Sequence, residues 1–135
     1  RKASFAAAAA AFREVTGELG ASLPKLQEEA LFKQAEALFN AGSHKECSVA
    51  AKAYLDAYKP PGGRFSRDIL KLSGRNALQA PPGTLDPAER AMGASYYEQA
   101  AALSEDPSER LRMSYLSGVS SYYSDDFEKA SISLD

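Results

Sequence analysis

Apolar residues recur at helical spacing along nearly the whole chain. At its start, Phe5, Ala8, Phe12 and Val15 fall on one face of a helix, and Leu19 continues that face. No segment shows the alternation of apolar and polar residues that is typical of a β-strand. The pattern therefore predicts an all-α protein.

Turn and capping signals divide this pattern into about seven helices. Pro24 suits the first turn of a helix, and Asp86 with Glu89 has the spacing of a capping box. The first predicted helix ends before Gly20, and the second runs from 24 to about 41. The third runs from Ser43, paired with Glu46, to the residue before Pro60, and the next three cover about 65–78, 86 to about 103 and about 108–122. A seventh opens at Asp125 and Glu128. Short connections between helices predict antiparallel hairpins within one domain over 1–135.

Composition and charge exclude several classes of protein. The net charge of −2 gives no reason to expect nucleic-acid binding. One cysteine, Cys47, and one histidine, His44, allow neither an intrachain disulfide nor a structural zinc site, and we expect no metal and no cofactor. Apolar runs are too short for membrane insertion. The chain opens with Arg1 rather than Met, and we expect it to be a fragment of a longer array.

Two segments of the chain echo one another. When Ala30 of the stretch 30–47 is laid on Met113 of the stretch 113–130, aromatic meets aromatic and small meets small. The matched pairs are Phe32 with Tyr115, Ala35 with Gly118, Phe39 with Tyr122, His44 with Phe127 and Cys47 with Ala130. Because Gly costs about 1 kcal/mol relative to Ala inside a helix, Gly118 and Gly93 are predicted to be positions of close helix contact.

On these positions the chain resembles the tetratricopeptide repeat family. The family's small first-helix residue matches Ala35 and Gly118, and its small second-helix residue matches Cys47 and Ala130. Second-helix patterns also fit Phe5, Ala8, Phe12 and Val15, and the segment around Gly93, Tyr97 and Ala100. The resemblance implies stacked helix hairpins in a right-handed superhelix. The spacing between units is wider than in the family, and the excess falls in the two Pro/Gly loops.

The helix around residues 30–41 carries two apolar stripes. Leu31, Ala35 and Leu38 form one, and Phe32 and Phe39 form the other. If the resemblance holds, the second stripe lines a concave groove that binds an extended peptide or a helix of a partner. The expected groove residues are Phe32, Glu36, Phe39, Asn40, Tyr115, Val119, Tyr122 and Tyr123. The other interpretation is that both stripes belong to the core.

Other candidate sites carry a weaker signal. Arg64, Arg67, Lys71 and Arg75 recur at helical spacing and form either a dock for an acidic partner or a solvated helix face. Cys47 and His44 lie one turn apart, which could bring a thiol and a base together, but the repeat gives Cys47 a packing role. No convincing catalytic set is present, and we do not expect an enzyme.

The function that these observations favour is a protein–protein interaction scaffold. The alternative is a structural module that self-associates end to end through its terminal helices. Phe32 and Glu36 stand where chaperone-binding relatives carry Lys and Asn, which argues against that role in this unit. The aromatic-rich helices are similar both to those of bacterial envelope repeat proteins and to those of cytosolic scaffolds. The sequence therefore does not decide between periplasm and cytoplasm.

Overall fold

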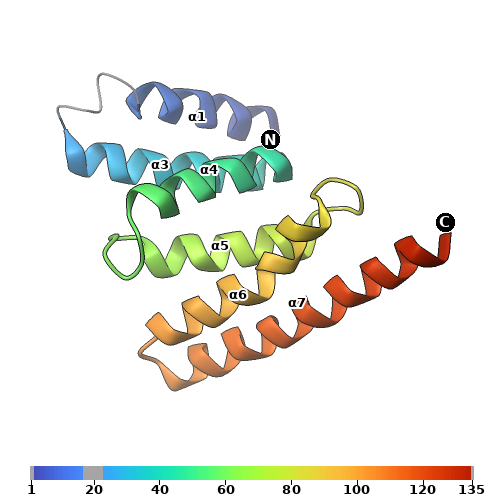
Figure 1. The fold of residues 1–135 in the computed structure, drawn as a ribbon. Helices are drawn as coiled ribbons and strands as arrows, with labels where there is room; N and C mark the ends of the chain where they lie inside the picture. Colours follow the sequence, from blue (N-terminus) through green and yellow to red (C-terminus); the bar gives the residue numbers. More distant parts are fainter. Residues whose placement is uncertain (1, 17–22, 135) are drawn as a thin grey trace.

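The computed structural model describes residues 2–16 and 23–134, with side chains described as far as Ser124. The described residues form six helices and no strand, which confirms the all-α prediction. The helices are α1 (Lys2–Val15), α3 (Pro24–Asn40), α4 (His44–Ala57), α5 (Ser66–Gln79), α6 (Pro87–Leu103) and α7 (Pro107–Leu134). Figure 1 shows them stacked from α1 at one end to α7 at the other. Leu19 lies outside the described residues.

Local signals set most helix ends where the sequence predicts them. Pro24 occupies the first turn of α3, and Gly42 follows the end of α3 with φ of +80°, a conformation that favours glycine. The capping box of α6 is formed, because the Asp86 side chain accepts a hydrogen bond from the Glu89 backbone N–H at 2.8 Å. The corresponding prediction for Ser43 is wrong: Ser43 precedes α4, but its side chain makes no capping bond.

The predicted break at Asp125 is also wrong. α7 continues as one helix of 28 residues from Pro107 to Leu134. A glycine in the left-handed conformation separates α3 from α4 at Gly42, whereas the six residues before Asp125 include no glycine or proline. An acid alone is a weak stop signal because Asp is tolerated inside helices. The matched segments 30–47 and 113–130 therefore differ in structure, and the side chains of Phe127 and Ala130 lie outside the described residues.

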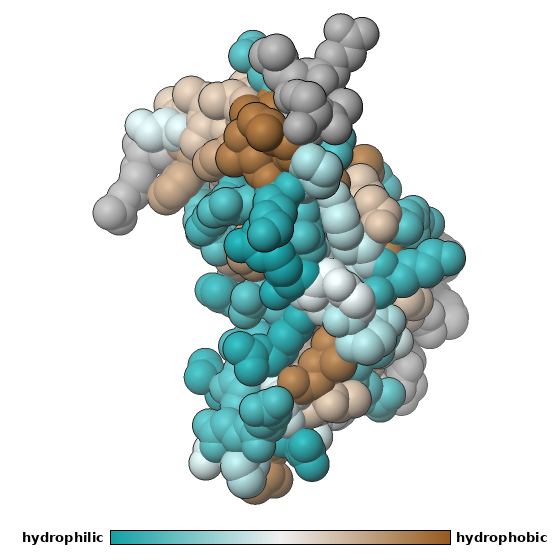
Figure 2. Space-filling model, turned by 90° about the vertical axis from the view of Figure 1, so that its left-hand side faces the viewer, coloured by the Kyte–Doolittle hydropathy of each residue, from teal (hydrophilic) through white to brown (hydrophobic). Residues whose placement is uncertain are grey.

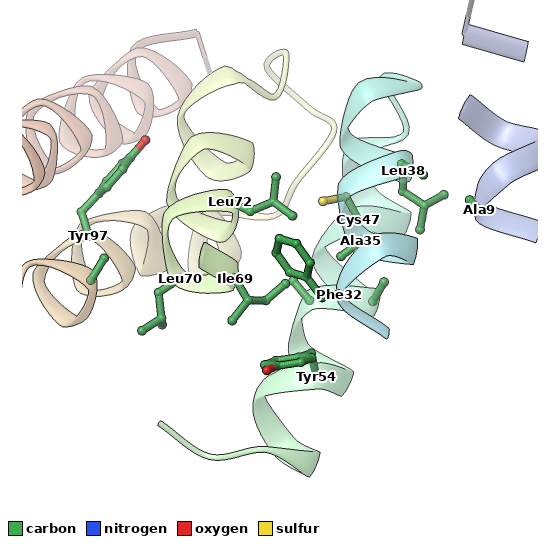
Figure 3. Packing of buried hydrophobic residues seen from close by; sticks show 14 of the residues in the cluster. Ala9, Phe32, Ala35, Leu38, Cys47, Tyr54, Ile69, Leu70, Leu72 and Tyr97 are labelled. Atoms are coloured by element: carbon green, nitrogen blue, oxygen red, sulfur yellow. The ribbon is translucent and has the colours of Figure 1, made fainter. Parts of the chain in front are cut away.

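Each helix packs mainly against its neighbours in the chain, and α5 also contacts α3 and α7. Figure 3 shows Phe32 from α3, Tyr54 from α4 and Ile69 from α5 pointing into the space between these helices. Small residues allow the close approach. A Cβ on Gly74 would lie 2.8 Å from the ring of Tyr97 on α6, so α5 and α6 meet only because Gly74 has no side chain.

The glycine predictions for α6 and α7 have different outcomes. Gly93 is a contact position, since a Cβ there would lie 2.5 Å from Ser120 Oγ and 3.0 Å from Ala77 Cβ. Gly118 is not, because a Cβ there would meet nothing within 4 Å. Within the described part of the chain, the close contact expected at Gly118 is therefore not made.

The buried carboxylate of Glu28 and the buried hydroxyl of Tyr54 fix the connection between α4 and α5. Glu28 on α3 accepts hydrogen bonds from the Tyr54 hydroxyl and from the Arg64 N–H, both at 2.7 Å. The Tyr54 oxygen in turn accepts from the Phe65 N–H at 2.9 Å. These bonds tie the loop between α4 and α5 to both helices of the preceding hairpin.

At the next connection, the buried Arg90 of α6 caps the C-terminal end of α5. Its guanidinium donates to the carbonyls of Ala77 at 3.2 Å, Ala80 at 3.0 Å and Pro81 at 3.0 Å. The Ala77 carbonyl lies in the last turn of α5, where carbonyls lack intrahelical partners, and Ala80 and Pro81 follow directly after the helix. The cap of α5 is therefore a side chain from the following helix.

One face of the stack is largely polar (Figure 2). Figure 2 shows a mostly hydrophilic face with separate hydrophobic patches toward the two ends of the stack. Among the described helices, none is both long and apolar enough to cross a membrane.

Candidate binding surface

Phe32, the first of the predicted groove residues, belongs to the core. Its side chain is 7 % exposed, and its ring stacks on Phe65 with centroids 4.8 Å apart and planes 3° from parallel. The loop that leads into α5 brings Phe65 over α3, which the spacing of residues along α3 alone does not reveal. For Phe32, the interpretation of the second stripe as core is therefore correct.

The other α3 residues predicted for the groove lie at the surface or near it. Phe39 is half-buried, with the Arg75 guanidinium 4.9 Å from its ring centroid and His44 against its edge at 5.8 Å. Glu36 is half-buried and pairs with Lys33 at 3.2 Å, and Asn40 is exposed. Phe39 therefore lies at the boundary between α3 and α5, partly covered by a cation.

The predicted tyrosines of α7 are strongly exposed. Tyr115 is 70 %, Tyr122 68 % and Tyr123 46 % exposed, while Val119 is half-buried. The rings of Tyr122 and Tyr123 meet edge to face at 5.5 Å. Large apolar side chains gathered on a surface in this way mark interaction sites more often than scattered ones do.

The basic stripe is the solvent-exposed strip of a helix that is otherwise buried. Eight of the fourteen residues of α5 are buried, from Ser66 to Ala77. The side chains that remain at the surface include Arg67, Lys71 and Arg75. Arg64 lies just before α5, with its guanidinium 5.0 Å from the Phe65 ring centroid. Because α5 lies between α3 and α7, this strip is in the middle of the stack.

A fifth cation, Arg112 of α7, joins Arg64 and the three cations of α5. Lys71 forms an ion pair and a hydrogen bond with Glu109 of α7. The hydrogen bond lowers the pKa of the Glu109 carboxyl below its ordinary value, and the positive charges of Lys71, Arg112 and Arg67 lower it further. Burial raises the pKa of the Tyr97 phenol, and the nearby charges of Arg75 and Arg112 oppose that rise. The cations of α5 and α7 therefore act on the same groups.

Sequence reasoning missed Arg112 because it lies on a separate helix, far from the stripe in sequence. The spacing of residues along α7 does place Arg112 in line with the predicted groove residues of that helix. Arg112, Tyr115, Val119 and Tyr122 recur at intervals of three and four residues, so they form one strip along α7. We call the three strips together the α3–α5–α7 surface: Glu36, Phe39 and Asn40; Arg67, Lys71 and Arg75; Glu109, Arg112, Tyr115, Val119 and Tyr122.

Cys47 and His44 are not a thiol–base pair. Cys47 is fully buried, and burial raises the pKa of its thiol to about 12. His44 instead bonds to Asn76 of α5, with Nδ1 and Asn76 Oδ1 2.8 Å apart, and Asn76 Nδ2 donates to the His44 carbonyl at 2.9 Å. The thiol is a packing element and the histidine joins α4 to α5.

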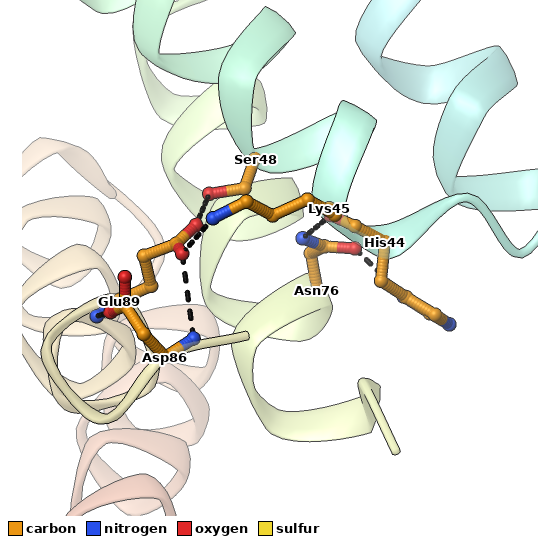
Figure 4. Close-up of polar contacts among 6 residues, drawn as sticks. All are labelled: His44, Lys45, Ser48, Asn76, Asp86 and Glu89. Atoms are coloured by element: carbon orange, nitrogen blue, oxygen red, sulfur yellow. Dashed lines mark hydrogen bonds and ion pairs between the residues drawn. The ribbon is translucent and has the colours of Figure 1, made fainter. Parts of the chain in front are cut away.

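Figure 4 shows the second polar joint, between α4 and the start of α6. Burial opposes ionisation of Glu89, but hydrogen bonds from Lys45, Ser48 and Asp86 outweigh it and hold the pKa of the carboxyl below its ordinary value. A cavity beside this joint, lined by Ser48, Ser73, Asn76 and Glu89, measures about 10 Å³. It has room for about one water molecule, so it is no substrate pocket.

Among the residues whose side chains are described, no cluster of three or more His, Cys, Asp or Glu residues could hold a metal ion. Comparison with known proteins gives no further guide: no protein-family model, characterised protein or solved structure matches the chain.

Proposed function

We propose that the protein is an interaction scaffold that binds an acidic segment of a partner protein along the α3–α5–α7 surface. The observation that carries this proposal is the charge of that surface. Arg67, Lys71, Arg75 and Arg112 gather on two neighbouring helices, with Glu109 as the acid that pairs within them. The whole chain has a net charge of −2, so this surface opposes the overall balance. Charge complementarity of this kind directs partner choice and association rate.

The neighbouring aromatics supply the apolar part of the contact. Tyr115 exposes a large ring one turn along α7 from Arg112, Tyr122 exposes another two turns further on, and Phe39 lies beneath Arg75. Aromatic and arginine side chains together are the residue types that dominate binding energy at protein interfaces. A partner with carboxylates flanking a few apolar anchors would match this arrangement, either as a helix or as an extended chain.

The order of helix contacts supports a tetratricopeptide-like stack as the scaffold. In such a stack the first helices of successive hairpins lie side by side and form the binding face. Here α5 contacts α3 on one side and α7 on the other, as that proposal requires. We propose that α3, α5 and α7 are first helices and that α1, α4 and α6 are second helices.

The test is binding of fluorescent peptides, measured by anisotropy. An array of peptides rich in Asp and Glu with Leu or Tyr anchors is compared with its Lys-rich counterpart. We expect the acidic set to bind more tightly, and binding to weaken between low and moderate salt. Reversing the charge at two positions, with Arg67→Glu and Arg75→Glu together, should raise the Kd for the acidic peptides by about tenfold or more.

The matched control reverses two exposed lysines elsewhere. Lys52 on α4 and Lys59 after it are both exposed, so Lys52→Glu with Lys59→Glu makes the same change in net charge away from the surface. If both double variants weaken binding equally, the effect is one of total charge and the site is wrong. Equal binding of the acidic and Lys-rich peptides would also reject the proposal.

A further inference from the structure

The side of α7 that faces away from α6 carries an apolar seam. Leu111 is 73 % exposed and Tyr122 68 % exposed, and Gly118 lies between them. Leu111, Tyr115, Gly118 and Tyr122 are spaced by four, three and four residues, which is the spacing of a helix–helix seam. This seam borders the strip that begins at Arg112, and the two share Tyr115 and Tyr122.

Gly118 indicates how closely another helix approaches this seam. A glycine inside a helix is unfavourable compared with alanine. At Gly74 and Gly93 other helices pack so closely that a Cβ would not fit. At Gly118 a Cβ would meet nothing within 4 Å, so no contact in the described part of the molecule accounts for it. A helix crossing over Gly118 would account for it.

The opposite end of the stack presents a matching surface. α1 packs on α3 through Ala9, with Ala8 and Phe12 partly buried, whereas Ala3, Ala7, Ala10 and Ala11 are exposed. An alanine surface lets another helix approach closely and offers room for large side chains such as Leu111 and Tyr122.

The stack itself defines the relation between the two ends. α3 packs between α1 and α4, and α5 packs between α4 and α6. A helix on the free side of α7 would give α7 the same two-sided environment, and a helix on the free side of α1 would do the same there. We propose that a second copy of this chain stacks its α1 on the α7 of the first, so that the helix order continues from one molecule to the next.

Such an interface is head-to-tail rather than two-fold symmetric, and it can repeat into longer assemblies. It consists chiefly of one helix on one helix, which is small beside the roughly 1,200–2,000 Å² buried in stable complexes. The association is therefore weak and depends on concentration. It leaves the basic strip of α5 outside the contact but covers Tyr115 and Tyr122, which also belong to the α3–α5–α7 surface.

The test is sedimentation equilibrium of the 135-residue chain from micromolar to about millimolar concentration. We expect the average mass to rise from that of one chain toward two and more. Gly118→Glu should block the α7 side without unfolding the chain, because a side chain there meets open space and Glu favours helix more than Gly does. Ala7→Glu with Ala11→Glu should block the α1 side, and Val49→Glu, at an exposed position on α4, is the control.

Mixing the two blocked variants separates this arrangement from others. Each blocked variant alone should remain a single chain, and the equimolar mixture should form dimers and nothing larger, because only one α7 face and one α1 face stay open. A mass of one chain at every concentration would reject the proposal. So would association that survives the α1 change, since it would mean pairing of α7 with α7. These results do not depend on whether acidic peptides bind.

Discussion

Phe32 and Phe65 stack in parallel across the junction of α3 and α5, with ring centroids 4.8 Å apart. This contact joins α3 to the entry of α5, and it places Phe32 in the core. The two aromatic rings of the second α3 stripe therefore have different roles, since Phe39 remains half-buried beneath Arg75.

Replacing Phe32 should destabilise the fold strongly. Phe32→Ala removes a buried ring and its stacking contact with Phe65, and we expect a loss of about 3–5 kcal/mol in the free energy of unfolding. Phe39→Ala should cost clearly less because that ring is half-buried. Urea denaturation followed by circular dichroism measures both, and equal losses would show that the two rings are equally buried in solution.

Replacing the tyrosines of α7 should leave stability nearly unchanged. Tyr115→Ala with Tyr122→Ala removes rings that are 70 % and 68 % exposed, so we expect the free energy of unfolding to change by less than about 1 kcal/mol. The same double variant should weaken binding of the acidic peptides. Val49→Ala with Met92→Ala, also at exposed apolar positions, should leave both properties unchanged. A large loss of stability in the tyrosine variant would mean that α7 packs differently.

Removing one hydroxyl from the loop between α4 and α5 should have a measurable cost. Tyr54→Phe leaves the buried Glu28 with one donor fewer and the Phe65 N–H without its acceptor. We expect a loss of about 1–3 kcal/mol, the cost of leaving buried polar groups unsatisfied. Tyr58→Phe, which removes the same hydroxyl from a half-buried ring nearby, is the control for the chemistry of the change. Hydrogen exchange at the Phe65 amide should accelerate in the Tyr54 variant alone.

The single cysteine should be unreactive in the folded protein. With the pKa of the Cys47 thiol at about 12, the thiolate fraction at pH 8 is lower than that of an ordinary thiol by about 10³-fold. Alkylation by iodoacetamide, followed by mass spectrometry, should therefore be slow in buffer and fast in denaturant. Rapid alkylation of the native chain would show that α3 and α4 open more readily than their packing indicates.

Local chemistry predicted much of the fold, while contacts between distant residues had to be observed. Pro24 and the Asp86–Glu89 pair act on the backbone within one turn, so their effect can be read from sequence. The prediction of a helix break at Asp125 was wrong because an acid caps a helix only where the chain already turns. The helix ends were thus predictable wherever a proline or glycine fixed the backbone conformation.

The candidate binding surface was predictable only in part, for the same reason. Periodicity identified the exposed tyrosines of α7 and the cations of α5, because each set lies on one helix. It could not show that Phe65 covers Phe32, or that Arg112 lies among the charges of α5. Both facts depend on how separate helices pack against one another.

The cap that Arg90 places on α5 has a consequence for how the stack assembles. Arg90 binds the Ala77 carbonyl in the last turn of α5 and the Ala80 and Pro81 carbonyls just beyond it, so these bonds form only when α6 packs against that end of α5. We therefore expect the two helices to gain protection against hydrogen exchange together, as one cooperative folding unit, rather than one after the other along the chain.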